Sequence, residues 1–170
     1  MTEHLWPLLR LNAPSDKELQ EAYRQVFIEA YVKNKRGEDV KLYDCNGKRV
    51  HFSAKCFDHA FSESSNYRFS CGIHDIPFSK KRARCMLWIK EVLSASNGTI
   101  ERRHQVRRDN RNRLKKRRVL IVLEEKYVVV LEERPNPGEL EFITAFQADA
   151  VYLDRIRKES MLVETKKPQS

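Results

Sequence analysis

The sequence predicts a single α+β domain over residues 1–170, with N-terminal helices packed on a four-stranded antiparallel sheet and a small extra β-hairpin. Two observations predict this class. Apolar residues recur three and four positions apart in the first half of the chain, whereas they alternate with polar residues in much of the second half. Successive strand patterns with short connections are expected to pair antiparallel, and helices followed by a meander indicate an α+β fold.

The composition fits an ordered domain, with 41% hydrophobic, 9% aromatic and 34% charged residues. No apolar run approaches the roughly 20 residues of a membrane span. Glu3 and Pro7 interrupt the N-terminus, where a signal peptide needs an unbroken apolar stretch. We therefore expect a cytoplasmic protein whose four cysteines are reduced and mostly buried.

The first elements are a helix and a hairpin. Ser15 and Glu18 form a capping box, and the apolar stripe that follows predicts a helix over residues 15–34. Apolar residues alternate on both sides of Asn46-Gly47, which predicts a hairpin with a tight turn and places His51 on its polar face.

Two further helices are expected before the sheet. Ser53 can cap a short helix that displays His59, and Pro77 with Ser79 begins a second strong helix that ends before Gly98. The segments TIERRHQ, RRVLIVLEE, KYVVVLEE and ELEFITAF then predict four strands. A helix over 150–160 and a frayed tail over 161–170 complete the predicted order.

The net charge of +9 comes from one segment, residues 102–118, which holds ten Lys/Arg and one acid. The rest of the chain is balanced, with 23 basic and 23 acidic side chains. Such a block repels itself unless a polyanion or an acidic surface compensates it, so we expect nucleic-acid contact here. The predicted phosphate-binding residues are Arg102, Arg107, Arg108, Arg111, Arg113, Lys115, Lys116 and Arg117.

Two Cys-x-x-His pairs, Cys56/His59 and Cys71/His74, raise the alternative of a zinc site. Structural zinc sites usually set their ligands on tight turns, whereas the first pair lies in a predicted helix. A 170-residue domain also has no need of a metal to fold. We therefore predict no metal and no cofactor, and the zinc reading stays open as the alternative.

Histidine is the side chain best suited to proton transfer near neutral pH. His51 and His59 are the better candidates, since one lies on a polar strand face and the other on a short helix directly after it. His4 and His74 are expected to be ordinary surface or core residues, and His104 part of the basic segment. The sequence contains no nucleophile elbow, phosphate loop or dinucleotide fingerprint.

The order of several motifs resembles the phage-type members of the barnase/EndoU/colicin/RelE-like (BECR) nuclease superfamily. The resemblance covers residues 38–147 and rests on HFSAKCFDHAF, on a helix with Arg-Ala and Trp-Ile pairs in KKRARCMLWIKEVL, on RRVLIVLEEKYVVVLEE and on LEFITAF. It implies helices packed on a four-stranded antiparallel sheet and metal-independent RNA cleavage on a face of that sheet.

The resemblance also implies roles for individual residues. His59 would be base or acid, with His51 as a second candidate. Thr144 would donate a hydrogen bond to the phosphate, and Arg103 or Arg118 would stabilise its charge. Glu101 and Glu141 are acidic residues that could replace histidine as the base.

Strict alternation along ELEFITAF puts Thr144 on the same face as Leu140, Phe142 and Phe146. Either that face is open and its aromatic residues stack RNA bases, or Thr144 is a core hydroxyl and Phe142 and Phe146 are core residues.

The sequence thus predicts a metal-independent endoribonuclease in which a ribose 2′-hydroxyl attacks the phosphodiester and a histidine transfers the protons. The alternative is a non-catalytic nucleic-acid-binding protein that uses the 102–118 segment, with or without a structural zinc site. The expected partner is RNA, and tRNA or another structured RNA is a candidate. Because the resemblance is to toxin-like nucleases, an inhibitor or antitoxin protein is a further candidate partner. No membrane partner is expected.

Overall fold

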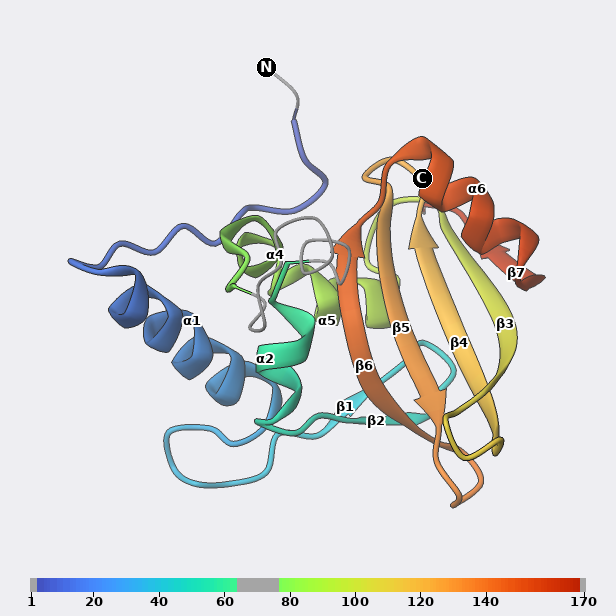
Figure 1. Cartoon of the computed structure of the whole chain (residues 1–170), viewed down its shortest axis with the longest axis horizontal. Coiled ribbons are helices and arrows are strands. Elements are labelled where there is room, and N and C mark those ends of the chain that lie inside the picture. Colours follow the sequence, from blue (N-terminus) through green and yellow to red (C-terminus); the bar gives the residue numbers. More distant parts are fainter. Residues whose placement is uncertain (1–2, 64–76, 169–170) are drawn as a thin grey trace.

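The computed structural model describes residues 3–63 and 77–168 of the chain. Figure 1 shows α1, α2, α4 and α5 on one side of a sheet and α6 beside its other face. In chain order the elements are α1 (Asp16–Tyr31), β1 (Leu42–Tyr43), β2 (Arg49–His51), α2 (Cys56–Ala60), α4 (Lys80–Arg84), α5 (Trp88–Ser94), β3 (Ile100–Arg108), β4 (Leu114–Val122), β5 (Tyr127–Glu133), β6 (Glu139–Gln147), α6 (Ala150–Lys158) and β7 (Met161–Lys166).

The strands of the described residues form one mixed sheet of seven strands, in the order β1-β2-β6-β5-β4-β3-β7. The expected four-stranded antiparallel sheet is therefore wrong. The meander β3–β6 is its centre, but the predicted hairpin joins it as well, because β2 runs parallel to the first residues of β6. Strand β7 adds to the opposite edge, antiparallel to β3. Both additions pair segments that are distant in sequence, which periodicity alone does not reveal.

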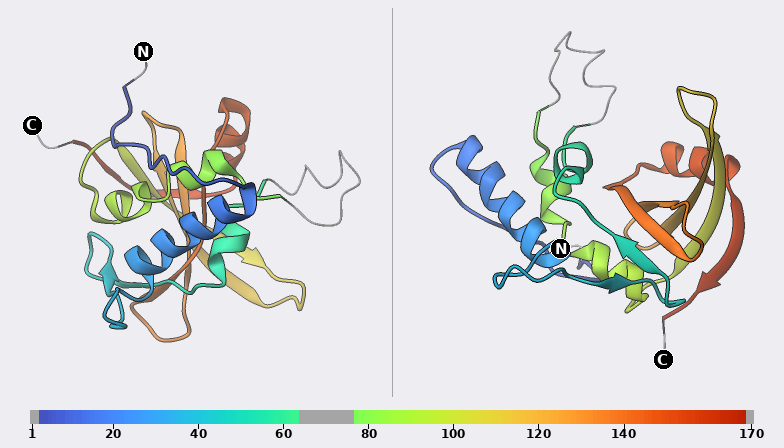
Figure 2. Two further views of the ribbon diagram at one scale, coloured as in Figure 1. Left: turned by 90° about the vertical axis from the view of Figure 1, so that its left-hand side faces the viewer. Right: turned by 90° about the horizontal axis from the view of Figure 1, so that it is seen from below.

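The sheet curls, and its two faces carry different cores (Figure 2). The convex face packs against the helices through a cluster rich in aromatic side chains, among them Phe27, Phe57, Trp88 and Phe142. The concave face holds α6, whose Leu153 packs on a smaller aliphatic cluster from β4 and β5. Burial of these two clusters fixes which residues of each strand face the helices and which face α6.

A β-bulge in β6 decides the orientation of Thr144. Val130 of β5 pairs with Thr144, and the next residue, Leu131, pairs with Phe142, so Ile143 is an extra residue in β6. Phe142 is fully buried in the convex-side core, whereas Thr144 lies opposite Val130 of the concave-side cluster. The expectation that Thr144 shares a face with Leu140 and Phe142 is wrong, because the bulge shifts the alternation by one residue.

The helix expected from Ser79 is interrupted, giving α4 and then α5. Ser79 caps α4 by accepting a hydrogen bond from the Arg82 amide. At the break, the carbonyl oxygens of Cys85 and Met86 accept hydrogen bonds from the buried hydroxyls of Tyr127 and Tyr31. These tertiary bonds satisfy carbonyls that a continuous helix would use itself, and they set the position of α4 against the end of β6.

The predicted first and last helices are confirmed, with bounds within three residues of those expected. The expectation of a frayed tail after residue 160 is wrong, because Met161–Lys166 forms β7. Its backbone hydrogen bonds with β3 order a segment whose side chains are mostly exposed.

Candidate active site

The C-terminal half of β6 is flanked by α2 and α4. Strand β2 pairs with β6 only as far as Glu141, and α2 packs along the strand beyond that point. The Cys56 thiol points to the carbonyl oxygen of Phe142, at 3.5 Å. His59 follows Cys56 by three residues on α2 and is exposed to solvent. Its neighbour Asp58 pairs with Arg24 of α1.

Arg82 of α4 reaches the same part of β6. The carbon of its guanidinium group lies 5.3 Å from the centre of the Phe146 ring, and one of its nitrogens donates to the carbonyl oxygen of Ala60, at 3.5 Å. Thr144 lies on the same face of β6 as Phe146, two residues before it. The structure thus places Arg82 over Phe146, with Thr144 on the same face of β6 and His59 exposed on the helix that packs along this strand. We call these four residues the β6 site: His59, Arg82, Thr144 and Phe146.

Arg82 has an unusual environment for a cation. It is half-buried, and in residues 3–63 and 77–168 no carboxylate lies within ion-pair distance of it. Burial lowers the pKa of Arg82 from its ordinary value, and the carboxylate of Glu63 acts in the opposite direction. A guanidinium group stays charged in proteins despite such burial, so the β6 site holds a partly desolvated positive charge that an anion could neutralise.

His51 lies on the same concave face, further down the sheet. It stands opposite Glu141, and its Nε2 is 3.2 Å from a carboxylate oxygen of Glu139, close enough for an ion pair but not aligned as a hydrogen bond. Thr144 lies three positions beyond Glu141 along β6, a distance of about 10 Å. His51 is therefore near the β6 site but not part of the cluster around Arg82.

Neither arginine expected at the phosphate lies beside Thr144. Arg103 faces the concave side but is three strands away, about 14 Å at the usual strand spacing. It is buried, pairs with Glu101 at 3.0 Å and donates to the carbonyl oxygens of Arg157 and Ser160. Arg103 thus holds α6 and the start of β7 in place.

Arg118 lies on the opposite, convex face of the sheet. It is buried and pairs with Glu133 at 2.8 Å, which holds the pKa of that carboxyl below its ordinary value. His104 stands opposite Arg118 on β3, and burial together with Arg118 and Arg102 lowers the pKa of its imidazole. The candidate bases also lie apart, since Glu101 is buried in the pair with Arg103 and Glu141 is exposed beside His51.

The remaining basic residues of the 102–118 segment form the end of the β3–β4 hairpin. Pairing with β7 stops at His104 and pairing with β5 begins at Arg117, so residues 105–116 project beyond both neighbouring strands (Figure 2). We call this projection the basic arm. Within the described residues, side chains of the segment that pair with carboxylates are Arg102, Arg103, Arg113, Lys115, Arg117 and Arg118, and those that do not are Arg107, Arg108, Arg111 and Lys116.

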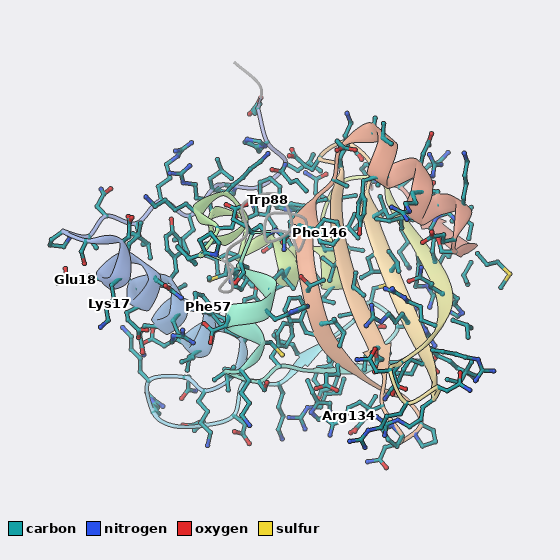
Figure 3. The ribbon with its side chains drawn as sticks, in the orientation of Figure 1. Lys17, Glu18, Phe57, Trp88, Arg134 and Phe146 are labelled. Atoms are coloured by element: carbon teal, nitrogen blue, oxygen red, sulfur yellow. The ribbon has the colours of Figure 1, made fainter. Side chains whose placement is uncertain are left out.

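The β6 site and the basic arm lie at opposite ends of the sheet. Phe146 aligns through Val128 with Ile121 of β4, which is six residues from Lys115 in the arm, or about 20 Å. Figure 3 shows the same separation, with Phe146 at one end of the sheet and Arg134, near the arm, at the other.

The alternative zinc site depends on Cys71 and His74, which lie outside the described residues. Within residues 3–63 and 77–168 no group of three or more His, Cys, Asp or Glu side chains is arranged to hold a metal ion. In the same part of the chain, none of the helices combines the length and the apolar character that a membrane span requires.

Comparison of the chain with known protein families, with curated proteins and with solved structures found no match. The candidate site therefore rests on the geometry of the chain itself. Sequence reasoning missed Arg82 as a site residue, although it is the arginine of the Arg-Ala pair that contributes to the nuclease resemblance.

Proposed function

We propose that the protein is a cytoplasmic, metal-independent endoribonuclease of the BECR type, with the β6 site as its catalytic centre. The observation that carries this proposal is the arginine at that site. Arg82 is half-buried, lies over Phe146 and has no carboxylate partner in the described part of the chain. A preorganised cation of this kind is suited to a phosphate whose negative charge grows during the reaction.

The other residues of the site supply the remaining parts of RNA cleavage. Attack of a ribose 2′-hydroxyl on the adjacent phosphorus needs a base, a proton for the leaving 5′-oxygen and donors to the phosphate oxygens. His59, exposed beside β6, is the proposed base. Thr144 is the proposed hydroxyl donor to the phosphate, together with Arg82. His51 lies about 10 Å from Thr144, too far to donate directly, so solvent water is the proposed source of the proton for the leaving 5′-oxygen.

The basic arm supports the same proposal. Its exposed cations would bind phosphates of the RNA strand outside the β6 site. Successive phosphates of a stacked strand are spaced by about 3.4 Å along its axis, so 20 Å corresponds to about six nucleotides. An RNA bound at the β6 site would reach the arm only when it extends about that far along the concave face.

The test is an RNA cleavage assay in EDTA, which removes divalent ions. The wild-type protein is expected to cut mixed RNA and to leave 2′,3′-cyclic phosphate ends. His59→Ala should slow the reaction about 100-fold or more, a typical effect of losing a proton-transfer group. The matched control is Lys55→Ala, which removes the exposed side chain of the residue that precedes α2 and should leave the rate unchanged.

Absence of cleavage by the wild-type protein, both in EDTA and after addition of a divalent ion, would contradict the proposal. The second candidate, a binding protein without chemistry, is favoured by one observation, the unpaired cations of the basic arm. It predicts RNA binding that weakens with salt and does not depend on His59.

A further inference from the structure

Tyr152, on the first turn of α6, is an aromatic residue that the ribonuclease proposal does not yet use. It is 45% exposed, and its ring meets the Phe146 ring edge-on, with centroids 5.6 Å apart and an interplanar angle of 62°. The neighbouring Val151 is 82% exposed. Phe146 thus contacts both the Tyr152 ring and the Arg82 guanidinium.

Helix α6 holds Tyr152 in place. The Asp149 carboxylate caps the helix by accepting a hydrogen bond from the Tyr152 amide, at 2.8 Å. Leu153 is buried in the concave-side cluster. Near the other end of α6, Arg157 pairs with the buried carboxylate of Glu101 at 2.8 Å. An exposed aromatic ring on a helix fixed in this way loses little conformational entropy when a ligand stacks on it.

We propose that Tyr152 and Phe146 form a subsite for one unpaired nucleobase, next to the phosphate bound by Arg82. The subsite rests on the proposed ribonuclease function for its place beside the bond that is cut. Bases stack on aromatic rings and arginine planes, and this recognition requires a base that is not already stacked in a helix. The substrate class is therefore RNA with a single-stranded or looped-out nucleotide at the cleavage position, and continuous duplex is excluded.

The experiment measures binding separately from cleavage. The probe is a single-stranded 2′-O-methyl RNA, which lacks the attacking hydroxyl, with 2-aminopurine as the fluorescent base. Wild-type protein should bind it and quench the fluorescence. Tyr152→Ala should reduce the quenching and weaken binding about 5- to 150-fold, the fold-change expected for loss of one stacked base. Tyr152→Phe keeps the ring and should retain both.

The matched control is Tyr43→Ala, which removes a tyrosine that is 50% exposed on β1 and aligns through Arg49 with Glu139, seven residues from Phe146 or about 23 Å. It should leave binding unchanged, and annealing the probe to its complement should abolish the difference between Tyr152→Ala and wild type. Circular dichroism of each variant verifies that it is folded.

Three results would overturn the subsite: wild-type protein that does not bind the probe, Tyr152→Ala that binds and quenches like wild type, or Tyr152→Ala that cleaves RNA at the wild-type rate. Quenching that depends on Tyr152 in a protein that cuts no RNA would instead support the subsite and contradict only the ribonuclease proposal.

Discussion

The two ends of the sheet carry positive charge in different ways. The β6 site has one arginine, half-buried and in contact with Phe146, whereas the basic arm presents several exposed cations on a projecting hairpin. Exposed charges are screened by salt and attract any polyanion, while a partly buried charge acts strongly over a short distance. The basic arm, which has the highest charge density, is therefore suited to binding a polyanion. Arg82 of the β6 site is suited to stabilising charge on a reacting phosphate.

A third group of arginines belongs to neither end. Arg103 and Arg118 are buried and ion-paired, and they connect elements of the fold. Substitutions can separate these three roles, because loss of a buried pair changes stability, loss of the site arginine changes rate, and loss of the arm changes salt-dependent binding.

The largest effect is expected for Arg103→Ala. The change removes one of the two arginines that pair with the buried Glu101 carboxylate, together with the bonds to the Arg157 and Ser160 carbonyls. Breaking a buried ion pair by removing one partner typically lowers the free energy of unfolding by about 3–5 kcal/mol. Urea denaturation measures this quantity. The control is Arg107→Ala on the same strand and face, which is exposed and should change stability by no more than about 0.5 kcal/mol.

If Arg103→Ala instead proved as stable as Arg107→Ala but lost RNA cleavage, Arg103 would belong to the catalytic centre and the division between the regions would be wrong.

Next in size is Arg82→Ala. Removal of a preorganised donor to a reacting group typically slows the reaction about 100-fold or more. The cleavage rate of saturating RNA in EDTA measures the effect, and the loss should be the same at low and high salt because the charge acts at short range. Lys81→Ala, an exposed neighbour on α4, is the control and should cleave normally. Full activity of Arg82→Ala would remove the main support for the β6 site.

Much of the fold was predictable because local signals and tertiary structure agree. The Ser15–Glu18 box starts α1 as expected, and the four strands of the meander lie where their alternation predicts them. The exceptions come from pairing with distant residues. The parallel alignment of β2 with β6 and the docking of β7 on β3 depend on which edges the finished sheet leaves open, and no local pattern encodes that.

The site was harder to predict for the same reason. Alternation placed Thr144 with Phe142, and one extra residue at Ile143 reverses this. Arg103 and Arg118 were chosen because they lie on strands within the basic segment. Their pairing with Glu101 and Glu133 becomes visible only when both partners are placed in three dimensions. The sequence does not single out Arg82, because what distinguishes it is that no carboxylate of the described residues lies within ion-pair distance of its guanidinium group.

A smaller effect is expected when the basic arm loses the charges of Arg107, Arg108, Arg111 and Lys116 together. For single strands the slope of log affinity against log salt changes by about 0.7 per phosphate contact, so four contacts correspond to a change of about 3. Titrations of uncleavable RNA at several salt concentrations measure the slope. RNAs shorter than about six nucleotides should be cut at the wild-type rate, because they do not span the 20 Å to the arm.

The control removes four exposed basic residues elsewhere, Lys17, Lys35, Arg36 and Lys41, and so causes the same change in net charge. An equal loss of salt dependence in both variants would show that net charge, not the arm, determines RNA affinity.

The smallest effect concerns Arg118 and its partner on the convex face. Hydrogen bonds from Arg118 hold the pKa of Glu133 below its ordinary value. A carboxylate with a lowered pKa in the folded state stabilises the protein above its unfolded-state pKa of about 4.5, and this contribution is lost as the pH falls through the folded-state pKa. Glu133→Gln should therefore be less stable than wild type at neutral pH, and the difference should shrink below pH 4.5 or so. Thermal unfolding from pH 7 to pH 3 measures it. A difference that stayed constant over this range would mean that Arg118 stabilises the sheet by packing and not through its ion pair, and the buried arginines would then not form one class.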